Sequence, residues 1–145
     1  MTFYIVAEAS ASPGVHITLA PAFELTQISS LAGMLTPVRG FGAFGAVPQE
    51  LATFTSREGE SVSVLKLERS PALLKLHAIL VHGVEARGGK FVNSNFIRDG
   101  FQPHISGAAL DAQLPIFDTL KLSQYSYGEF TTHAQLDLRI HRGNH

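Results

Sequence analysis

The stretches VHITLA (residues 15–20) and FQPHISG (residues 101–107) lie far apart in the chain but share one pattern: histidine, isoleucine and a hydroxyl residue. Both stretches carry the apolar and β-branched residues that are typical of strands. Residues two apart in a strand point to the same face, so each histidine is expected beside a hydroxyl group, with the isoleucine in a core. The residues on these two polar faces are His16, Thr18, His104 and Ser106.

The bulk composition is that of one ordinary globular domain. The chain has 145 residues, of which 45% are hydrophobic and 16% are charged, and we expect a single domain over residues 1–145. It has no cysteine, which excludes disulfides and thiolate zinc sites. The net charge is −1, without the basic face by which proteins grip long nucleic acids. A small nucleotide or a short oligonucleotide is therefore the expected kind of partner.

Neither a membrane span nor a leader is visible in the sequence. No apolar run approaches the length of a membrane-spanning helix. The N-terminus, MTFYIVAEAS, has no basic region of the kind that opens a signal peptide. We therefore expect a cytoplasmic protein with no membrane partner, and the oligomeric state stays open.

Periodicity along the chain predicts interleaved strands and helices. Strands are expected over residues 3–7, 15–19, 61–67, 119–124 and 136–140, and from residue 105. Helices are expected over residues 22–35 and from Ser70 and Pro71 to the Gly88-Gly89 pair. The glycine-rich residues 38–47 predict a strand or a bulged hairpin. The fold class is therefore α+β with mostly antiparallel strands, arranged as two lobes that each hold strands, one helix and one histidine motif.

Two imidazoles beside two hydroxyl groups suit phosphodiester chemistry. One histidine can take a proton from water or from a ribose 2′-hydroxyl group, while the other, protonated, donates to the leaving oxygen. Histidine serves both roles because its unperturbed pKa is near 6.5. The hydroxyl groups can hold the non-bridging phosphate oxygens. This chemistry needs no metal and no cofactor. From the pattern alone, a pair of partly buried strand histidines satisfied by neighbouring groups is the favoured interpretation.

The two stretches resemble the paired histidine motifs of the 2H phosphoesterase superfamily, which includes 2′-5′ RNA ligase-like proteins and cyclic nucleotide phosphodiesterases. The resemblance covers most of the chain, including the opening strand FYIVAE and the helix that contains KLHAIL. It implies a bilobal α+β fold with two mostly antiparallel sheets, flanking helices and a central cleft between the motifs. It also implies metal-independent cleavage of 2′,3′-cyclic phosphates, 2′-5′ linkages or cyclic oligonucleotides. The size of the chain suits the small phage members, which degrade cyclic nucleotide signals of bacterial immunity.

The sequence departs from the family pattern at two places. The connection before His16 is too short for the helix that many members carry there, which reduces the first lobe. Gly107 follows Ser106, where the family usually has a bulkier apolar residue, and this loosens the second strand.

Aromatic and cationic residues supply further candidates for substrate binding. Base stacking needs exposed aromatic rings near a cleft, and we place Tyr4 and Phe101 first, followed by Tyr125 and Tyr127. The candidates for contacting a further phosphate are Arg39, Lys90, Arg98 and Lys121. Each of these residues also fits a boundary aromatic or a solvated surface charge.

The remaining histidines have simpler interpretations. His77 lies on the apolar stripe of the second expected helix, which favours a core or boundary position, and His82 shares no close face with it. His133 is expected to be solvated in a polar loop. His141 and His145 lie in a terminal tail that is expected to fray.

Three other functions compete with a phosphodiesterase. The same cleft can capture a cyclic nucleotide or an RNA end without cleaving it. The motif pair can also be coincidental in a structural protein. A metal hydrolase is the weakest alternative, because no Asp/His cluster has the spacing of a ligand set.

Overall fold

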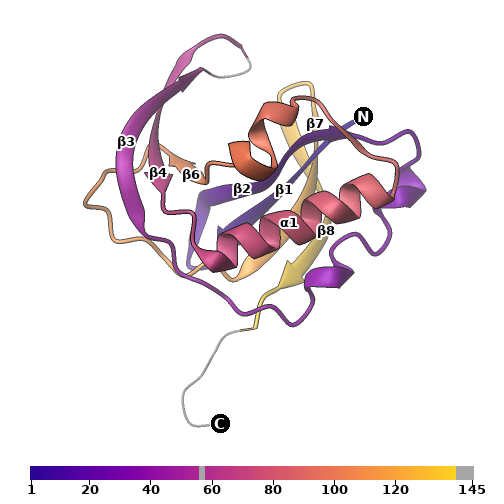
Figure 1. The fold of residues 1–145 in the computed structure, drawn as a ribbon, viewed down its shortest axis with the longest axis horizontal. Helices are drawn as coiled ribbons and strands as arrows, with labels where there is room; N and C mark the ends of the chain where they lie inside the picture. The colour runs from indigo at the N-terminus through magenta and orange to yellow at the C-terminus, as the bar shows by residue number, and fades with distance from the viewer. Residues whose placement is uncertain (56–57, 140–145) are drawn as a thin grey trace.

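The computed structural model describes residues 1–55 and 58–139. These residues form two sheets in which every strand pair is antiparallel (Figure 1). The larger sheet has the order β5-β2-β1-β7-β8, with bounds β1 (Thr2–Ala9), β2 (Ser12–Glu24), β5 (Lys90–Phe91), β7 (Thr119–Ser126) and β8 (Glu129–Asp137). The smaller sheet has the order β3-β4-β6, with bounds β3 (Pro48–Thr55), β4 (Ser61–Leu67) and β6 (His104–Ser106). The predicted α+β class with two antiparallel sheets is confirmed.

Helix α1 (Pro71–Ala86) has the predicted start and stop signals. The Ser70 hydroxyl accepts a hydrogen bond from the Leu73 N–H at 3.3 Å, and Pro71 occupies the first turn, where its missing N–H costs nothing. At the other end Gly88 has a left-handed φ of 78°. The Gly89 N–H then bonds back to the Val84 carbonyl at 2.9 Å, which ends the helix.

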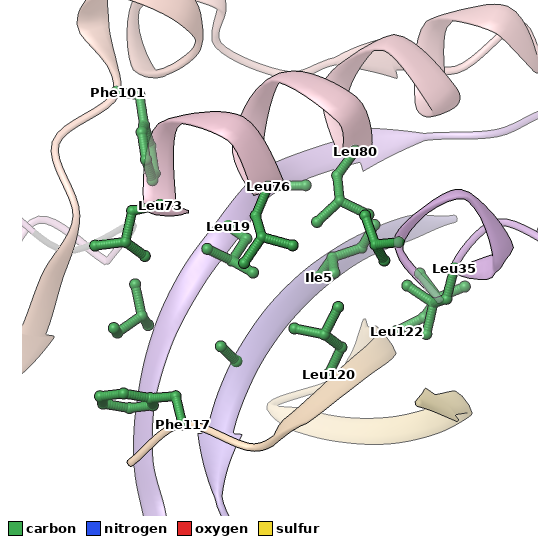
Figure 2. Close-up of a cluster of buried hydrophobic side chains, with 14 of the residues drawn as sticks. Ile5, Leu19, Leu35, Leu73, Leu76, Leu80, Phe101, Phe117, Leu120 and Leu122 are labelled. Carbon is green, nitrogen blue, oxygen red and sulfur yellow. The ribbon is translucent and has the colours of Figure 1, made fainter. Parts of the chain in front are cut away.

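The core lies between α1 and one face of the larger sheet (Figure 2). Burial alternates along β1, so that every second residue points toward the helix. The buried side chains drawn from α1 and from the sheet include Leu73, Leu76, Leu80, Ile5, Leu19, Leu120 and Leu122. This arrangement leaves the opposite face of the larger sheet uncovered by α1.

The helix predicted over residues 22–35 does not form. Strand β2 continues to Glu24, where it pairs with β1 and β5, and these backbone hydrogen bonds replace helical ones. Only two short 3₁₀ helices follow, η1 (Ile28–Leu31) and η2 (Thr36–Val38). The apolar residues that suggested helical spacing do not share one buried stripe, because Ile28 is 51% exposed while Leu25 and Leu35 are buried.

The prediction of one helix per lobe is therefore wrong. Among the described residues α1 is the only α-helix, and the smaller sheet has none of its own. The remaining helical turns are the 3₁₀ helices η3 (Ser94–Phe96) and η4 (Arg98–Gly100).

The glycine-rich residues 38–47 form neither a strand nor a hairpin. They run as a loop with two isolated bridges, Gly42 to Arg139 and Phe44 to Phe117. The rings of Phe44 and Phe117 stack at 5.7 Å, so the loop is anchored by side-chain packing rather than by a continuous ladder.

Several strand boundaries differ from the expected ones. Strand β1 extends to Ala9 and β2 already begins at Ser12, so only a tight turn connects them. Strand β3 has only exposed and half-buried residues and was not predicted. The last strand ends at Asp137 rather than at residue 140, and residue 140 lies outside the described part of the chain.

Within residues 1–55 and 58–139, no helix combines the length and the apolar character that crossing a membrane requires.

The packing of α1 gives a first testable prediction. Leu76 of α1 is fully buried between the helix and the larger sheet, so Leu76→Ala removes apolar contacts and leaves a cavity. The free energy of unfolding is expected to fall by about 2–5 kcal/mol, as measured by urea denaturation. His82→Ala, on the exposed side of the same helix, is the control and is expected to change it by no more than about 0.5 kcal/mol. Equal losses in both variants would contradict this packing.

Candidate active site

The first histidine motif lies on the face of the larger sheet opposite α1. Strand β2 places His16 across from Glu8 of β1, and Thr18 across from Val6. Ile17 between them is fully buried on the helix side. The alternation expected from the sequence therefore holds for this motif.

The second motif forms the short strand β6 at the edge of the smaller sheet. His104 pairs with Lys66 of β4, while Ile105 is buried and Ser106 is exposed. Gly107 has a left-handed φ of 74°, which glycine adopts without strain, so the strand ends directly after Ser106. This conformation suits the glycine at this position.

Both motif histidines are held in the same way. The Nδ1 atom of His16 lies 3.4 Å from the carbonyl oxygen of Gly14, and Nδ1 of His104 lies 2.9 Å from that of Gln102. A carbonyl oxygen only accepts, so Nδ1 donates in both rings. Each contact joins a histidine to the residue two positions before it. These contacts engage the Nδ1 atom of each ring and not its Nε2 atom.

Two adjoining cavities connect the motifs. The first, of about 510 Å³, is lined by His16 and Thr18, and the second, of about 440 Å³, by His104 and Ser106. Tyr4 and Thr18 line both cavities, and β2 contacts β6. The four motif residues therefore border one continuous cleft.

The aromatic candidates differ in how they meet the cleft. Tyr4 lies where the two cavities join, and Tyr125 lines the first. Phe101 is only 4% exposed and stacks on His77 at 3.9 Å, so it forms a packed wall of the second cavity. Tyr127 lies in the turn after β7, fully exposed with a φ of 51°, and lines neither cavity.

Of the four candidate cations, only Lys121 lines either cavity. Its ammonium group lies 2.6 Å from the Glu8 carboxylate, which neutralises it locally. Arg98 instead forms an ion pair with Glu85. Arg39 and Lys90 lie outside both cavities.

His77 connects the elements that carry the two motifs. Its Nδ1 atom donates to the Leu19 carbonyl of β2 at 2.6 Å, one residue beyond Thr18. Its Nε2 atom accepts the N–H of Arg98 at 2.9 Å, from the segment that leads to β6. This pair of contacts requires the neutral ring. The expected core position of His77 is confirmed, and burial lowers the pKa of its imidazole below the usual value.

Of the other histidines within the described residues, His82 and His133 line neither cavity. His133 lies in β8 rather than in the expected loop, although it is exposed as predicted, and it contacts Gln124 at 2.7 Å. His141 and His145 lie outside the described residues. Within the described ranges, no three His, Asp or Glu side chains are grouped so that they could hold a metal ion.

Three further aromatic residues in the cleft were not predicted from the sequence. Phe130 lines the first cavity, and Phe54 and Phe96 line the second. Phe54 lies on the unpredicted strand β3, where its ring meets His104 edge to face at 4.8 Å. Local patterning gave no signal for these residues, since their exposure depends on how distant segments fold together.

The two antiparallel sheets, each with one histidine motif, form the α+β fold that the resemblance implied. Solved structures confirm this fold. E. coli LigT complexed with 3′-AMP has a TM-score of 0.61 and 18% identity, covering 94% of this chain and 97% of LigT. The protein TT0787 of Thermus thermophilus has a TM-score of 0.62 and 17% identity, covering 98% of this chain and 100% of TT0787.

A structure described as a phosphoesterase has a TM-score of 0.59 and 16% identity, covering 95% of this chain and 98% of that protein. E. coli LigT has also been solved in complexes with NADP⁺ and with ATP. No protein-family model and no curated protein matches the chain by sequence. The likeness is therefore one of fold.

The buried neutral His77 gives a pH-dependent prediction. The unfolded chain binds this proton near pH 6.5, and the folded chain binds it only at a lower pH. As the pH falls below 6.5 the unfolded state holds more protons, so the free energy of unfolding decreases. His77→Asn removes this contribution. Its free energy of unfolding is expected to be lower at pH 7.5 but to fall less between pH 7.5 and 5.5.

Urea denaturation at both pH values measures the difference. His82→Asn, at an exposed position on the same helix, is the matched control and should keep the wild-type pH dependence. An unchanged pH dependence in His77→Asn would show that the buried imidazole is not the group responsible.

Proposed function

We propose that this protein is a metal-independent phosphodiesterase that cleaves a cyclic or 2′-5′-linked nucleotide by means of two histidines. The observation that carries the proposal is the shared tethering of His16 and His104. Each ring is oriented by a backbone carbonyl through Nδ1, and each borders the same cleft. Binding alone needs no such pair of oriented proton-transfer groups.

The reaction follows from the four motif residues. The Nε2 atom of one histidine removes a proton from water or from a ribose 2′-hydroxyl group, and that oxygen forms a bond to phosphorus. The protonated Nε2 atom of the other histidine gives its proton to the leaving oxygen as the old P–O bond breaks. The hydroxyl groups of Thr18 and Ser106 donate hydrogen bonds to the non-bridging oxygens. The two histidines exchange roles when the reaction runs in the opposite direction.

The structural neighbours support a nucleotide substrate. The same fold holds 3′-AMP, NADP⁺ or ATP in the LigT complexes. The net charge of −1 favours a small nucleotide or a short oligonucleotide over a long nucleic acid. A cyclic oligonucleotide of bacterial immunity is the narrowest substrate class within this proposal. A protein with that anti-defence role would act in the cytoplasm.

Removing the histidines tests the mechanism. His16→Ala and His104→Ala are each expected to lower kcat by about 10²–10⁴, since each removes one proton-transfer group. Products would be measured by chromatography with cyclic di- and trinucleotides, 2′,3′-cyclic nucleotides and 2′-5′-linked dinucleotides. Wild-type turnover should be unchanged by EDTA and by His82→Ala. Turnover that survives in the double histidine variant would refute the mechanism, and wild-type binding without cleavage would support a binding module instead.

The hydroxyl groups give a separate prediction. Thr18→Val keeps the shape of the side chain and Ser106→Ala shortens an exposed one, but each removes a donor to the developing charge on phosphate. Each is expected to lower kcat by about 10²–10³, with a smaller change in KM. Steady-state kinetics at fixed pH measures both constants. A rise in KM at constant kcat would assign the hydroxyl groups to ground-state binding only.

A further inference from the structure

We infer that the two cavities are separate nucleobase subsites, and that the preferred substrate carries two nucleosides joined by the scissile phosphodiester. The inference rests on the proposed function, because it places the reacting phosphate between the histidines. It goes further by assigning Phe130 to one base and Phe96 to the other.

The first subsite is built by strand register. The pairs Tyr4–Ser123, Ser123–Thr132 and Tyr125–Phe130 bring five strand positions onto the face that carries the first motif. Phe130 is 62% exposed, which is unusual for a phenylalanine that other rings hold in place. Its ring contacts those of Tyr4 and Tyr125 edge-on or tilted, with centroids 5.6 and 4.9 Å apart.

These contacts make Phe130 a supported ring rather than a loose one. Any of the nucleobases can stack on such a ring, because every base has a π face. The only cation among the described lining residues of this cavity, Lys121, is paired with Glu8, so its charge is offset locally. Glu58 is the remaining charged residue of the described lining.

The second subsite has a different composition. None of its described lining residues is Asp, Glu, Lys or Arg, which suits an uncharged base and disfavours a second phosphate. Phe96, 58% exposed, lies on η3 at its wall, and Phe54 lies against His104. Asn95 on the same turn also lines the cavity and offers an amide group to a base edge.

The turn that carries Phe96 is held in place by backbone packing. A Cβ atom on Gly100 would lie 1.9 Å from the Asn95 carbonyl oxygen, so η3 and η4 fit together only with glycine there. The wall of the second subsite is therefore a preformed surface, which lowers the ordering cost of binding.

The scissile phosphate is expected at the junction between the two cavities. Tyr4 and Thr18 line both cavities, and Thr18 is the hydroxyl residue of the first motif. A phosphate bonded to Thr18 therefore has one cavity on either side of it. A mononucleotide fills only one of them, whereas a dinucleotide linkage or a segment of a cyclic oligonucleotide fills both.

The test measures binding to a variant that lacks His16 and His104, so that turnover does not interfere. In the His16→Ala, His104→Ala background, calorimetry would compare 2′-5′-linked diadenosine monophosphate with 3′-AMP. Phe130→Ala and Phe96→Ala are each expected to weaken dinucleotide binding about 5- to 150-fold. Their combination should multiply the two losses. Only one of the two changes should affect 3′-AMP.

The controls are aromatic and apolar residues nearby that line neither cavity. Tyr127→Asn changes an exposed ring on the same hairpin as Phe130, and asparagine tolerates its positive φ. Val92→Ala changes an exposed residue shortly before Phe96. Both should leave the Kd of the dinucleotide unchanged. Phe130→Leu, which keeps an apolar side chain without a ring, should behave like Phe130→Ala.

The inference is overturned if the dinucleotide binds no more tightly than 3′-AMP, or if either phenylalanine proves dispensable for dinucleotide binding. Wild-type cleavage combined with either result would reject the two subsites and keep the phosphodiesterase. If the dinucleotide binds through both subsites but the wild type cleaves nothing, the two subsites are kept and the phosphodiesterase is rejected. The two conclusions are therefore tested separately.

Discussion

The neutral imidazole of His77 is the contact on which the geometry of the cleft depends. The motifs lie on two different sheets, so their relative position is not set by a shared ladder of hydrogen bonds. His77 bridges this gap from α1, donating to Leu19 in β2 and accepting from Arg98 in the segment before β6. Its ring also stacks on Phe101 with an interplanar angle of 4°. A protonated ring would leave the Arg98 N–H facing another donor, so the desolvation that keeps His77 neutral also keeps the motifs in place.

The larger sheet separates stability from function between its two faces. Alternate residues of β1 and β7 pack under α1, where burying each large apolar side chain contributes about 1.5–3 kcal/mol. The other residues of the same strands line the first cavity with hydroxyl, charged and aromatic groups. The face packed under α1 therefore holds the strands rigid, and this rigidity keeps the cavity-lining residues in position. Substitutions on the cavity-lining face need not disturb the core.

Local signals predicted the parts of the structure that local physics determines. The Ser70 cap, Pro71 and the glycines after α1 set both helix ends, and the strand over residues 61–67 has the expected bounds. The two-residue spacing of each motif predicted which residues share a face. Residues 22–35 were mistaken for a helix because pairing of β2 with β1 and β5, which no local pattern reveals, decided their conformation. The exposed rings of Phe130 and Phe96 depend on the same kind of distant packing.

The charge distribution of the cleft narrows the chemistry it can perform. Among the described residues lining the two cavities, Lys121 is the only lysine or arginine, and Glu8 neutralises it. Glu58 also lines the first cavity, so the described charged side chains there sum to one negative charge. That carboxylate repels a phosphate monoester, which carries close to two negative charges at neutral pH, more strongly than a phosphodiester. A phosphodiester carries a single charge, which one protonated histidine and two hydroxyl donors can balance. The charges of the described lining residues therefore favour the phosphodiester proposed as substrate over a terminal phosphate.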